Sequence, residues 1–136
     1  MEWESLTGFN MGSFSTTLTP YVQVVPQYQY YPTIGANSNY SSAVHPFIGT
    51  YYSRIEDYKR FKFNKFVYLG SKYKIVEQKK LGTSSYNSDF TTYANGLRQI
   101  NSRKGGQFIN LISIQNHMPY NNWYPKNYYA GKISGD

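Results

Sequence analysis

The chain has 136 residues, with 14 lysines and arginines against 7 aspartates and glutamates, so its formal net charge is +7. This length suits one small domain, and the absence of cysteine excludes disulfides and thiol chemistry. No apolar run reaches the roughly 18 residues of a transmembrane helix, and the first residues lack the pattern of a signal peptide. The positive charge favours an anionic partner.

The first forty residues show little regular pattern. We expect a short helix at Glu2–Thr7. The stretch Thr16–Tyr40 is rich in Tyr, Gln, Pro, Ser and Asn without periodicity, so we interpret it as a loop. A short strand is predicted at Tyr40–His45, and Pro46 follows at its exit.

Apolar residues at helical spacing come next in the chain. Tyr51, Ile55, Tyr58 and Phe61 predict an amphipathic helix over Tyr51–Phe61. Arg54 lies in the opening turn of this helix, nine residues after the histidine that ends the preceding strand. That turn can therefore face the same strand end.

A second strand is predicted at Lys65–Leu69. Basic residues gather around it in the span Lys59–Lys80, interleaved with tyrosine and phenylalanine, which is a pattern that nucleic-acid-binding faces also show. No RNP, zinc-finger or helix-turn-helix pattern accompanies these residues. We therefore interpret most of the lysines as a solvated face.

A longer helix is predicted over about Tyr86–Ser102, and Gly105 and Gly106 end it. A helix that leads directly into an apolar strand is typical of α/β proteins. The helix carries an apolar stripe at helical spacing. The members of this stripe are Phe90, Tyr93, Ala94, Leu97 and Ile100.

The third predicted strand, Phe108–Ile114, is an almost uninterrupted apolar run. Such a run predicts a strand that is buried on both faces of a mainly parallel sheet. His117 lies just past its end, where ligands bind in open α/β sheets. A polar turn that merely ends a core strand accounts for this motif equally well.

The two histidines of the chain, His45 and His117, both end predicted strands. The carboxyl ends of parallel strands meet at one edge of a sheet, so we expect the two histidines and Arg54 to converge on one anionic group. Arginine offers a planar fork of donors to phosphate or sulfate, and each histidine can donate a hydrogen bond or a proton.

Taken in order, these landmarks resemble an internal segment of the lipoteichoic acid synthase family of phosphoglycerol transferases. The resemblance implies an α/β fold, a partial alkaline-phosphatase/sulfatase-like sandwich with a mainly parallel sheet flanked by helices. It also implies that residues 1–136 are an internal segment of a sulfatase-like catalytic domain, incomplete at both ends. One departure is Lys62, which stands where the family has glycine. The matching segments are Glu2–Phe9, Ser42–Phe47, Tyr51–Arg54, Phe61–Phe66 and Leu111–Tyr120.

The resemblance further implies a chemistry. In the family, a threonine activated by a divalent metal, Mn²⁺ or Mg²⁺, attacks the phosphate of a phosphatidylglycerol headgroup, and the glycerol phosphate passes to a cell-envelope polymer. Carried over to this chain, His45, Arg54 and His117 would hold the phosphate or the glycerol of the headgroup, and Tyr52 would wall the pocket. One of the histidines would pass a proton to or from the alcohol.

The departures from the family concern the catalytic centre. The nucleophilic threonine and the metal ligands of the family fall outside this chain, and Thr7 lies on the wrong side of its acidic segment to replace the nucleophile. We therefore expect the chain alone to be inactive. Family members are anchored in the cell membrane by N-terminal helices and act outside the cell, and this chain lacks that anchor.

Two other hypotheses stay open. A non-catalytic module would bind an anionic polymer, teichoic acid or nucleic acid, through Lys59–Lys80 and the tyrosines, although we do not expect nucleic acid to be the partner. A general sulfatase or phosphatase ancestry is the second, but the Glu2–Phe9 segment and the spacing from His45 to Arg54 favour the phosphoglycerol branch. A sheet of three strands has two open edges, which predicts marginal stability for the chain alone.

Overall fold

The computed structural model describes residues 5–6, 40–119, 123–124 and 126 of the chain. Ser5 and Leu6 are helical, and the rest of the predicted Glu2–Thr7 helix lies outside the described residues, as does nearly all of the predicted loop Thr16–Tyr40. The described elements are β1 Ser41–Ile48, the 3₁₀ helix η3 Tyr51–Ser53, α4 Arg54–Arg60, β2 Lys65–Leu69, α5 Asp89–Ile100 and β3 Phe108–Leu111.

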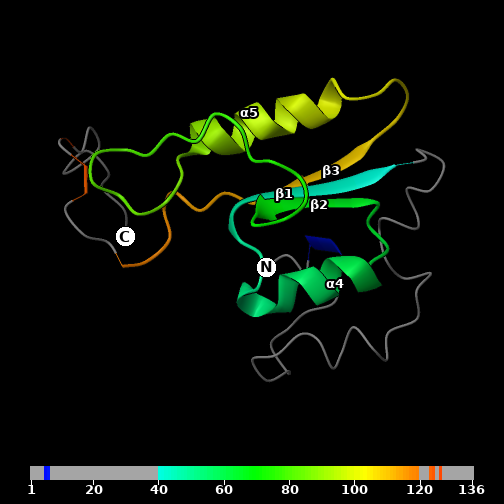
Figure 1. The fold of residues 1–136 in the computed structure, drawn as a ribbon, viewed down its shortest axis with the longest axis horizontal. Helices are drawn as coiled ribbons and strands as arrows, with labels where there is room; N and C mark the ends of the chain where they lie inside the picture. Colours follow the sequence, from blue (N-terminus) through cyan, green and yellow to red (C-terminus); the bar gives the residue numbers. More distant parts are fainter. Residues whose placement is uncertain (1–4, 7–39, 120–122, 125, 127–136) are drawn as a thin grey trace, which may run out of the picture.

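One parallel sheet with the strand order β2-β1-β3 forms the middle layer. Figure 1 shows α5 along one face of this sheet and α4 below the other. Val44 in the central strand pairs with Val67 on one side and with Leu111 on the other, so the carboxyl ends of all three strands point the same way. The predicted mainly parallel sheet flanked by helices is confirmed.

The central strand β1 is longer than expected. We predicted that it ends at His45, which is wrong, because β1 continues to Ile48. Its pairing with β2 becomes irregular between His45 and Ile48, and Pro46 lies in that interval. Proline has no N–H to donate to a ladder, so the strand stays extended while its regular pairing is lost.

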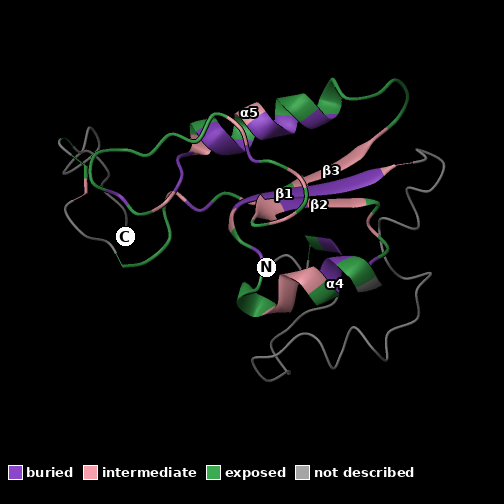
Figure 2. Cartoon of the chain, in the orientation of Figure 1, coloured by how far each residue is buried: buried purple, intermediate pink, exposed green. Residues whose placement is uncertain are grey.

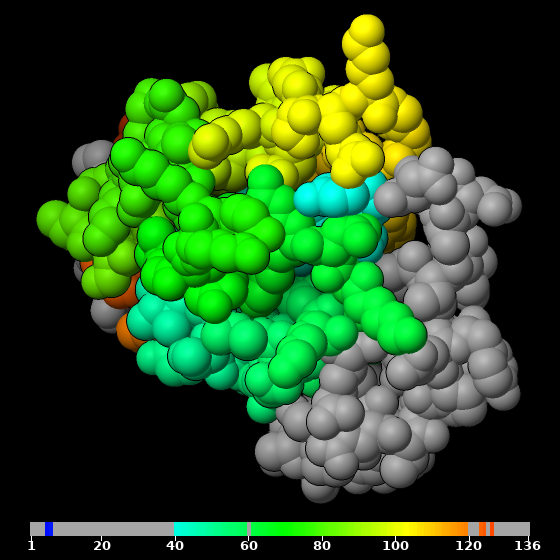
Figure 3. Space-filling view, turned by 45° about the vertical axis from the view of Figure 1, so that its right-hand side comes forward, coloured from blue at the N-terminus to red at the C-terminus, as the bar shows by residue number. Residues whose placement is uncertain are grey.

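The edge strand β3 is shorter and less buried than expected. It ends at Leu111 rather than Ile114, and each of its residues is half-buried or exposed. The strand that is buried along most of its length is β1, from Ser41 to Pro46. The prediction that Phe108–Ile114 is buried on both faces is therefore wrong, because the place of a strand in the sheet decides how far it is covered. In Figure 3 little cyan, the colour of the chain around residue 40 and the start of β1, is visible between the green and yellow segments.

Two apolar clusters lie on opposite faces of the sheet, as alternation along a strand requires. Ala43 belongs to the cluster with Leu6, Tyr58 and Phe61, under α4. The next residue, Val44, belongs to the cluster with Val67 and Ile75. This packing fixes α4, and therefore its first residue, against the sheet.

Helix α5 packs on the sheet through its polar side. It spans Asp89–Ile100 rather than the predicted Tyr86–Ser102, and most of its apolar stripe faces solvent, with Tyr93 67% and Leu97 58% exposed. Figure 2 shows the buried and exposed sides of this helix. Hydrophobic periodicity marks two faces of a helix but does not tell which one has a partner. The buried polar residues are Thr91, Thr92, Asn95 and Gln99.

The buried polar side chains of α5 form hydrogen bonds with the backbone of the segment before it, Val76–Lys79. The Asn95 amide accepts a hydrogen bond from the Val76 N–H at 3.0 Å and donates to the Val76 carbonyl at 2.8 Å. Thr91 Oγ1 accepts from the Lys79 N–H at 2.9 Å. These side chains therefore pair with the backbone of the segment as a neighbouring strand would. Within the described residues, no helix has the length and apolar character needed to cross a membrane.

Candidate functional site

The turn before α4 holds an unusual backbone. Tyr52 and Ser53 both have φ of 55°, in the left-handed region that residues other than glycine seldom adopt. The predicted single helix over Tyr51–Phe61 is therefore two elements, η3 and α4, separated at this turn. Strained residues of this kind cluster at ligand sites, where the surrounding structure holds them in place. The break makes Arg54 the first residue of α4.

Arg54 is held by its neighbours in one orientation. His45 is fully buried in β1, and its Nδ1 donates to the Ile112 carbonyl at 3.1 Å. The Nε2 atom of His45 then accepts from Arg54 Nη1 at 3.4 Å, since a guanidinium can only donate. The Tyr52 ring lies 5.0 Å from Arg54 Cζ, within the range of a cation–π contact.

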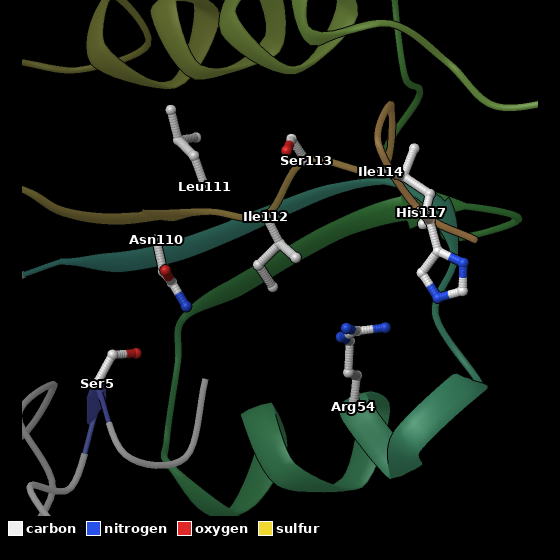
Figure 4. Close-up of a pocket in the computed structure, with 8 residues that line it drawn as sticks. All are labelled: Ser5, Arg54, Asn110, Leu111, Ile112, Ser113, Ile114 and His117. Atoms are coloured by element: carbon white, nitrogen blue, oxygen red, sulfur yellow. The ribbon is translucent and has the colours of Figure 1, made fainter. Parts of the chain in front are cut away.

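His117 approaches the same region from the loop beyond β3. Its Nδ1 lies 2.7 Å from the Met118 carbonyl, and because a carbonyl only accepts, Nδ1 carries the proton. The other side of the ring packs edge-on against Tyr86, with centroids 5.6 Å apart. In Figure 4 the exposed His117 ring points toward the Arg54 guanidinium.

A pocket of about 380 Å³ lies between these two side chains and the sheet (Figure 4). It is lined by residues 110–114 together with Ser5, Arg54 and His117. This volume is in the range of small-molecule sites. The described lining carries the fixed positive charge of Arg54 and has no carboxylate, so the pocket suits a small anion.

The four predicted site residues occupy two kinds of position. Arg54 and His117 line the pocket. His45 lies behind Arg54 with none of its surface exposed, and Tyr52 stacks on Arg54 while 63% of its surface stays exposed. The roles of all four as substrate ligands stay predictions, and the geometry makes His45 and Tyr52 neighbours of the arginine.

The pocket also contains polar residues that the sequence did not single out. Asn110 interrupts the apolar run of β3, which is a signal in the sequence, and its Nδ2 donates to the Tyr58 hydroxyl at 2.7 Å. Ser5 comes from the distant N-terminal segment and has no pattern that places it near β3. Only the folded chain brings these two residues to one site.

The described residues do not fit a metal ion. Among them, no three His, Cys, Asp or Glu side chains come together as a ligand cluster. In the pocket, His117 is the one residue of these four types. Sulfatase-like enzymes generally depend on a metal, and the residues described here offer no ligand set through which such a metal would act.

The sulfatase family model matches residues 1–136, the whole chain. A protein of Rhizobium meliloti (strain 1021) named for cyclic beta-1,2-glucan modification is 30% identical over 139 aligned residues. The alignment covers all of this chain but only 21% of that protein, so the chain spans about a fifth of the length of its curated relative.

Two solved structures share the fold. The Streptococcus pyogenes phosphoglycerol transferase GacH, in complex with sn-glycerol-1-phosphate, is 29% identical with a TM-score of 0.71, and the match covers 91% of this chain and 33% of that one. The lipoteichoic acid synthase LtaP from Listeria monocytogenes is 25% identical with a TM-score of 0.66, over 87% of this chain and 28% of that one. The chain therefore belongs to the sulfatase family, and its fold is that of the lipoteichoic acid synthase-type phosphoglycerol transferases, as the sequence predicted.

Proposed function

We propose that the chain forms the phosphate-binding part of a sulfatase-like phosphoglycerol transferase, which moves glycerol phosphate from phosphatidylglycerol to a cell-envelope polymer. The observation that carries the proposal is the pocket of about 380 Å³ with Arg54 and His117 in its lining. The matched GacH structure was solved with sn-glycerol-1-phosphate, and the Rhizobium relative is named for modification of a glucan, which is a polymer. The parent enzyme would work at the outer face of the cell membrane.

Arg54 would bind two oxygens of the phosphate. The contacts with His45 and Tyr52 hold its guanidinium before the ligand arrives. A donor that is already oriented loses less conformational freedom on binding, and a planar fork matches the spacing of phosphate oxygens. The buried histidine thus contributes to phosphate binding through the arginine.

His117 would handle the proton of the reacting alcohol. Its Nδ1 proton is engaged by the Met118 carbonyl, so a neutral ring presents the lone pair of Nε2. That lone pair can take the proton of a hydroxyl group whose oxygen attacks phosphorus, and the protonated ring can return it to a leaving alkoxide. We propose that the nucleophilic threonine and the divalent metal, Mn²⁺ or Mg²⁺, come from outside this chain, and we assign no step to the metal.

Titration of the chain with sn-glycerol-1-phosphate tests this proposal. We expect the His117→Ala variant to bind about five- to tenfold more weakly, because one hydrogen bond from a glycerol hydroxyl to Nε2 is worth about 1 kcal/mol. Isothermal titration calorimetry measures the change. Asn116→Ala is the matched control, because Asn116 is the exposed neighbour in the same loop and should leave affinity unchanged. Equal affinity of His117→Ala and the wild-type chain would contradict the proposal.

A second candidate function rests on the lysines around β2. The prediction of a solvated face is confirmed for most of them. Lys65 is the exception, because burial, followed by the nearby charge of Arg98, lowers the pKa of its ammonium group. Exposed lysines along one span of the chain suit a non-catalytic module for an anionic polymer. The exposed lysines are Lys59, Lys62, Lys72, Lys74, Lys79 and Lys80.

Salt dependence separates the two functions. With a glycerol-phosphate polymer as the probe, one phosphate held at Arg54 should cost only about threefold in affinity when salt rises fourfold. Six lysine contacts should cost more than about a hundredfold over the same range. We expect the shallow dependence. A steep dependence that persists in the His117→Ala variant would favour the binding module instead.

A further inference from the structure

We propose that four aromatic residues beside the pocket form a subsite for a sugar ring of the acceptor. These residues, called the aromatic wall below, are Phe47, Tyr51, Tyr86 and Trp123. The inference rests on the proposed function, since it names the acceptor that the phosphate pocket would serve.

The rings of the aromatic wall are in continuous contact. Phe47 lies 5.9 Å from Tyr51 and 5.3 Å from Tyr86, centroid to centroid, and Tyr86 lies 5.4 Å from Trp123. Tyr86 is fixed further by its hydroxyl, which donates to the Met118 carbonyl at 2.8 Å. Tyr51 is 54% exposed, so part of the wall is open to a ligand.

One residue of the phosphate pocket contacts the wall. His117 lines the pocket and also contacts Tyr86 edge-on at 5.6 Å. On the other side, Tyr51 begins η3, the element that leads through the strained turn to Arg54. A molecule that lies against the wall is therefore next to a phosphate held in the pocket, on the side of the His117 ring.

The chemistry of the wall favours a sugar over an acyl chain. A pyranose ring has one face of C–H groups, which packs on aromatic rings, and a rim of hydroxyl groups. Three of the four wall residues combine an apolar ring with a polar O–H or N–H at its edge, which suits such an amphipathic ligand. The Tyr86 hydroxyl already donates to the Met118 carbonyl. An acyl chain would offer no hydrogen-bond partner to the Tyr51 hydroxyl or the Trp123 N–H.

In the transfer that this arrangement would serve, one bond to phosphorus forms and one bond to phosphorus breaks. The oxygen of a sugar hydroxyl forms a bond to the phosphorus of a phosphoglyceryl group, and the bond from phosphorus to the enzyme's threonine, supplied from outside this chain, breaks. The proton of the sugar hydroxyl goes to Nε2 of His117, and the threonine oxygen regains a proton from that ring.

Ligand-observed NMR of the 136-residue chain with methyl β-glucoside and a β-1,2-linked glucose disaccharide tests the subsite. We expect saturation transfer to the C–H protons of the sugar ring, and at least a tenfold loss of affinity in both Tyr51→Ala and Trp123→Ala. Tyr93→Ala is the matched control, since Tyr93 is an exposed tyrosine on α5. Glycerol, which has no ring, should show no such transfer.

The outcomes for the wall and for the pocket are separable. Tyr51→Ala should keep its affinity for sn-glycerol-1-phosphate, and Arg54→Ala should lose that affinity and still bind the disaccharide. Absence of sugar binding by the wild-type chain, or unchanged sugar binding by both wall variants, overturns the subsite whatever the phosphate result. Wall-dependent binding to phosphatidylglycerol vesicles without sugar binding also overturns it, in favour of a membrane contact.

Discussion

Replacing Arg54 with alanine is expected to weaken binding of sn-glycerol-1-phosphate by roughly 30-fold, or about 2 kcal/mol. The guanidinium is the fixed positive charge in the described lining of the pocket, and His45 and Tyr52 hold it toward that pocket. Hydrogen bonds to a charged group are about twice as strong as neutral ones, so this substitution should exceed His117→Ala in effect. Calorimetric titration at constant salt measures the affinity.

Arg103→Ala is a closely matched control for that experiment. Arg103 also stacks on a tyrosine, with its Cζ 4.1 Å from the Tyr40 ring, but Tyr40 lies at the opposite end of β1. Both variants lose one positive charge and one cation–π contact. An equal loss of affinity in the two variants would show that net charge, and not the pocket, binds the ligand. Arg54→Lys should recover only part of the affinity, since it keeps the charge but lacks the planar fork.

Replacing Asn95 with alanine is expected to destabilise the chain by about 2–4 kcal/mol. Asn95 is fully buried, and its amide satisfies both the N–H and the carbonyl of Val76. Alanine would leave these two backbone groups without their partner, and an unsatisfied buried group costs about 1–3 kcal/mol. Urea denaturation followed by circular dichroism measures the free energy of unfolding.

The control for this substitution is Asn101→Ala. Asn101 follows α5 directly and is exposed, so its replacement should change the free energy of unfolding by less than about 0.5 kcal/mol. If Asn95→Ala unfolds at the same urea concentration as the wild-type chain, the polar contact is not what holds α5. Equal destabilisation by both variants would show that the buried contact of Asn95 is not the cause, since alanine has the higher helix propensity.

Elements that end at a glycine or another residue with a strong local preference could be predicted from the sequence. The bounds of β2 agree with the prediction because Gly70, with φ of 90°, ends a short apolar run. The end of β1 and the burial of β3 could not be predicted. A strand's coverage depends on its neighbours in the sheet, and its pattern alone does not encode the order β2-β1-β3.

The site shows the same division between local and long-range information. The approach of Arg54 and His117 to one pocket followed from the rule that ligands bind beyond the carboxyl ends of parallel strands. The buried position of His45 behind Arg54 could not be predicted in the same way. The His45 ring is held by the Ile112 carbonyl, which is 67 residues away in the sequence. The left-handed pair Tyr52 and Ser53 carries no glycine or asparagine that would have indicated it.

The polar contact beneath α5 gives this helix a fixed registration. Apolar contacts are non-directional, so two apolar surfaces can shift along one another with little change in free energy. The hydrogen bonds of Asn95 and Thr91 to the backbone of the segment Val76–Lys79 are directional and form at one position only. A displacement of one residue along the helix axis would break all of them together. These bonds therefore fix the position of the segment Val76–Lys79 along the helix axis. The loop that follows this segment begins from a fixed position, and it places the Tyr86 ring against His117.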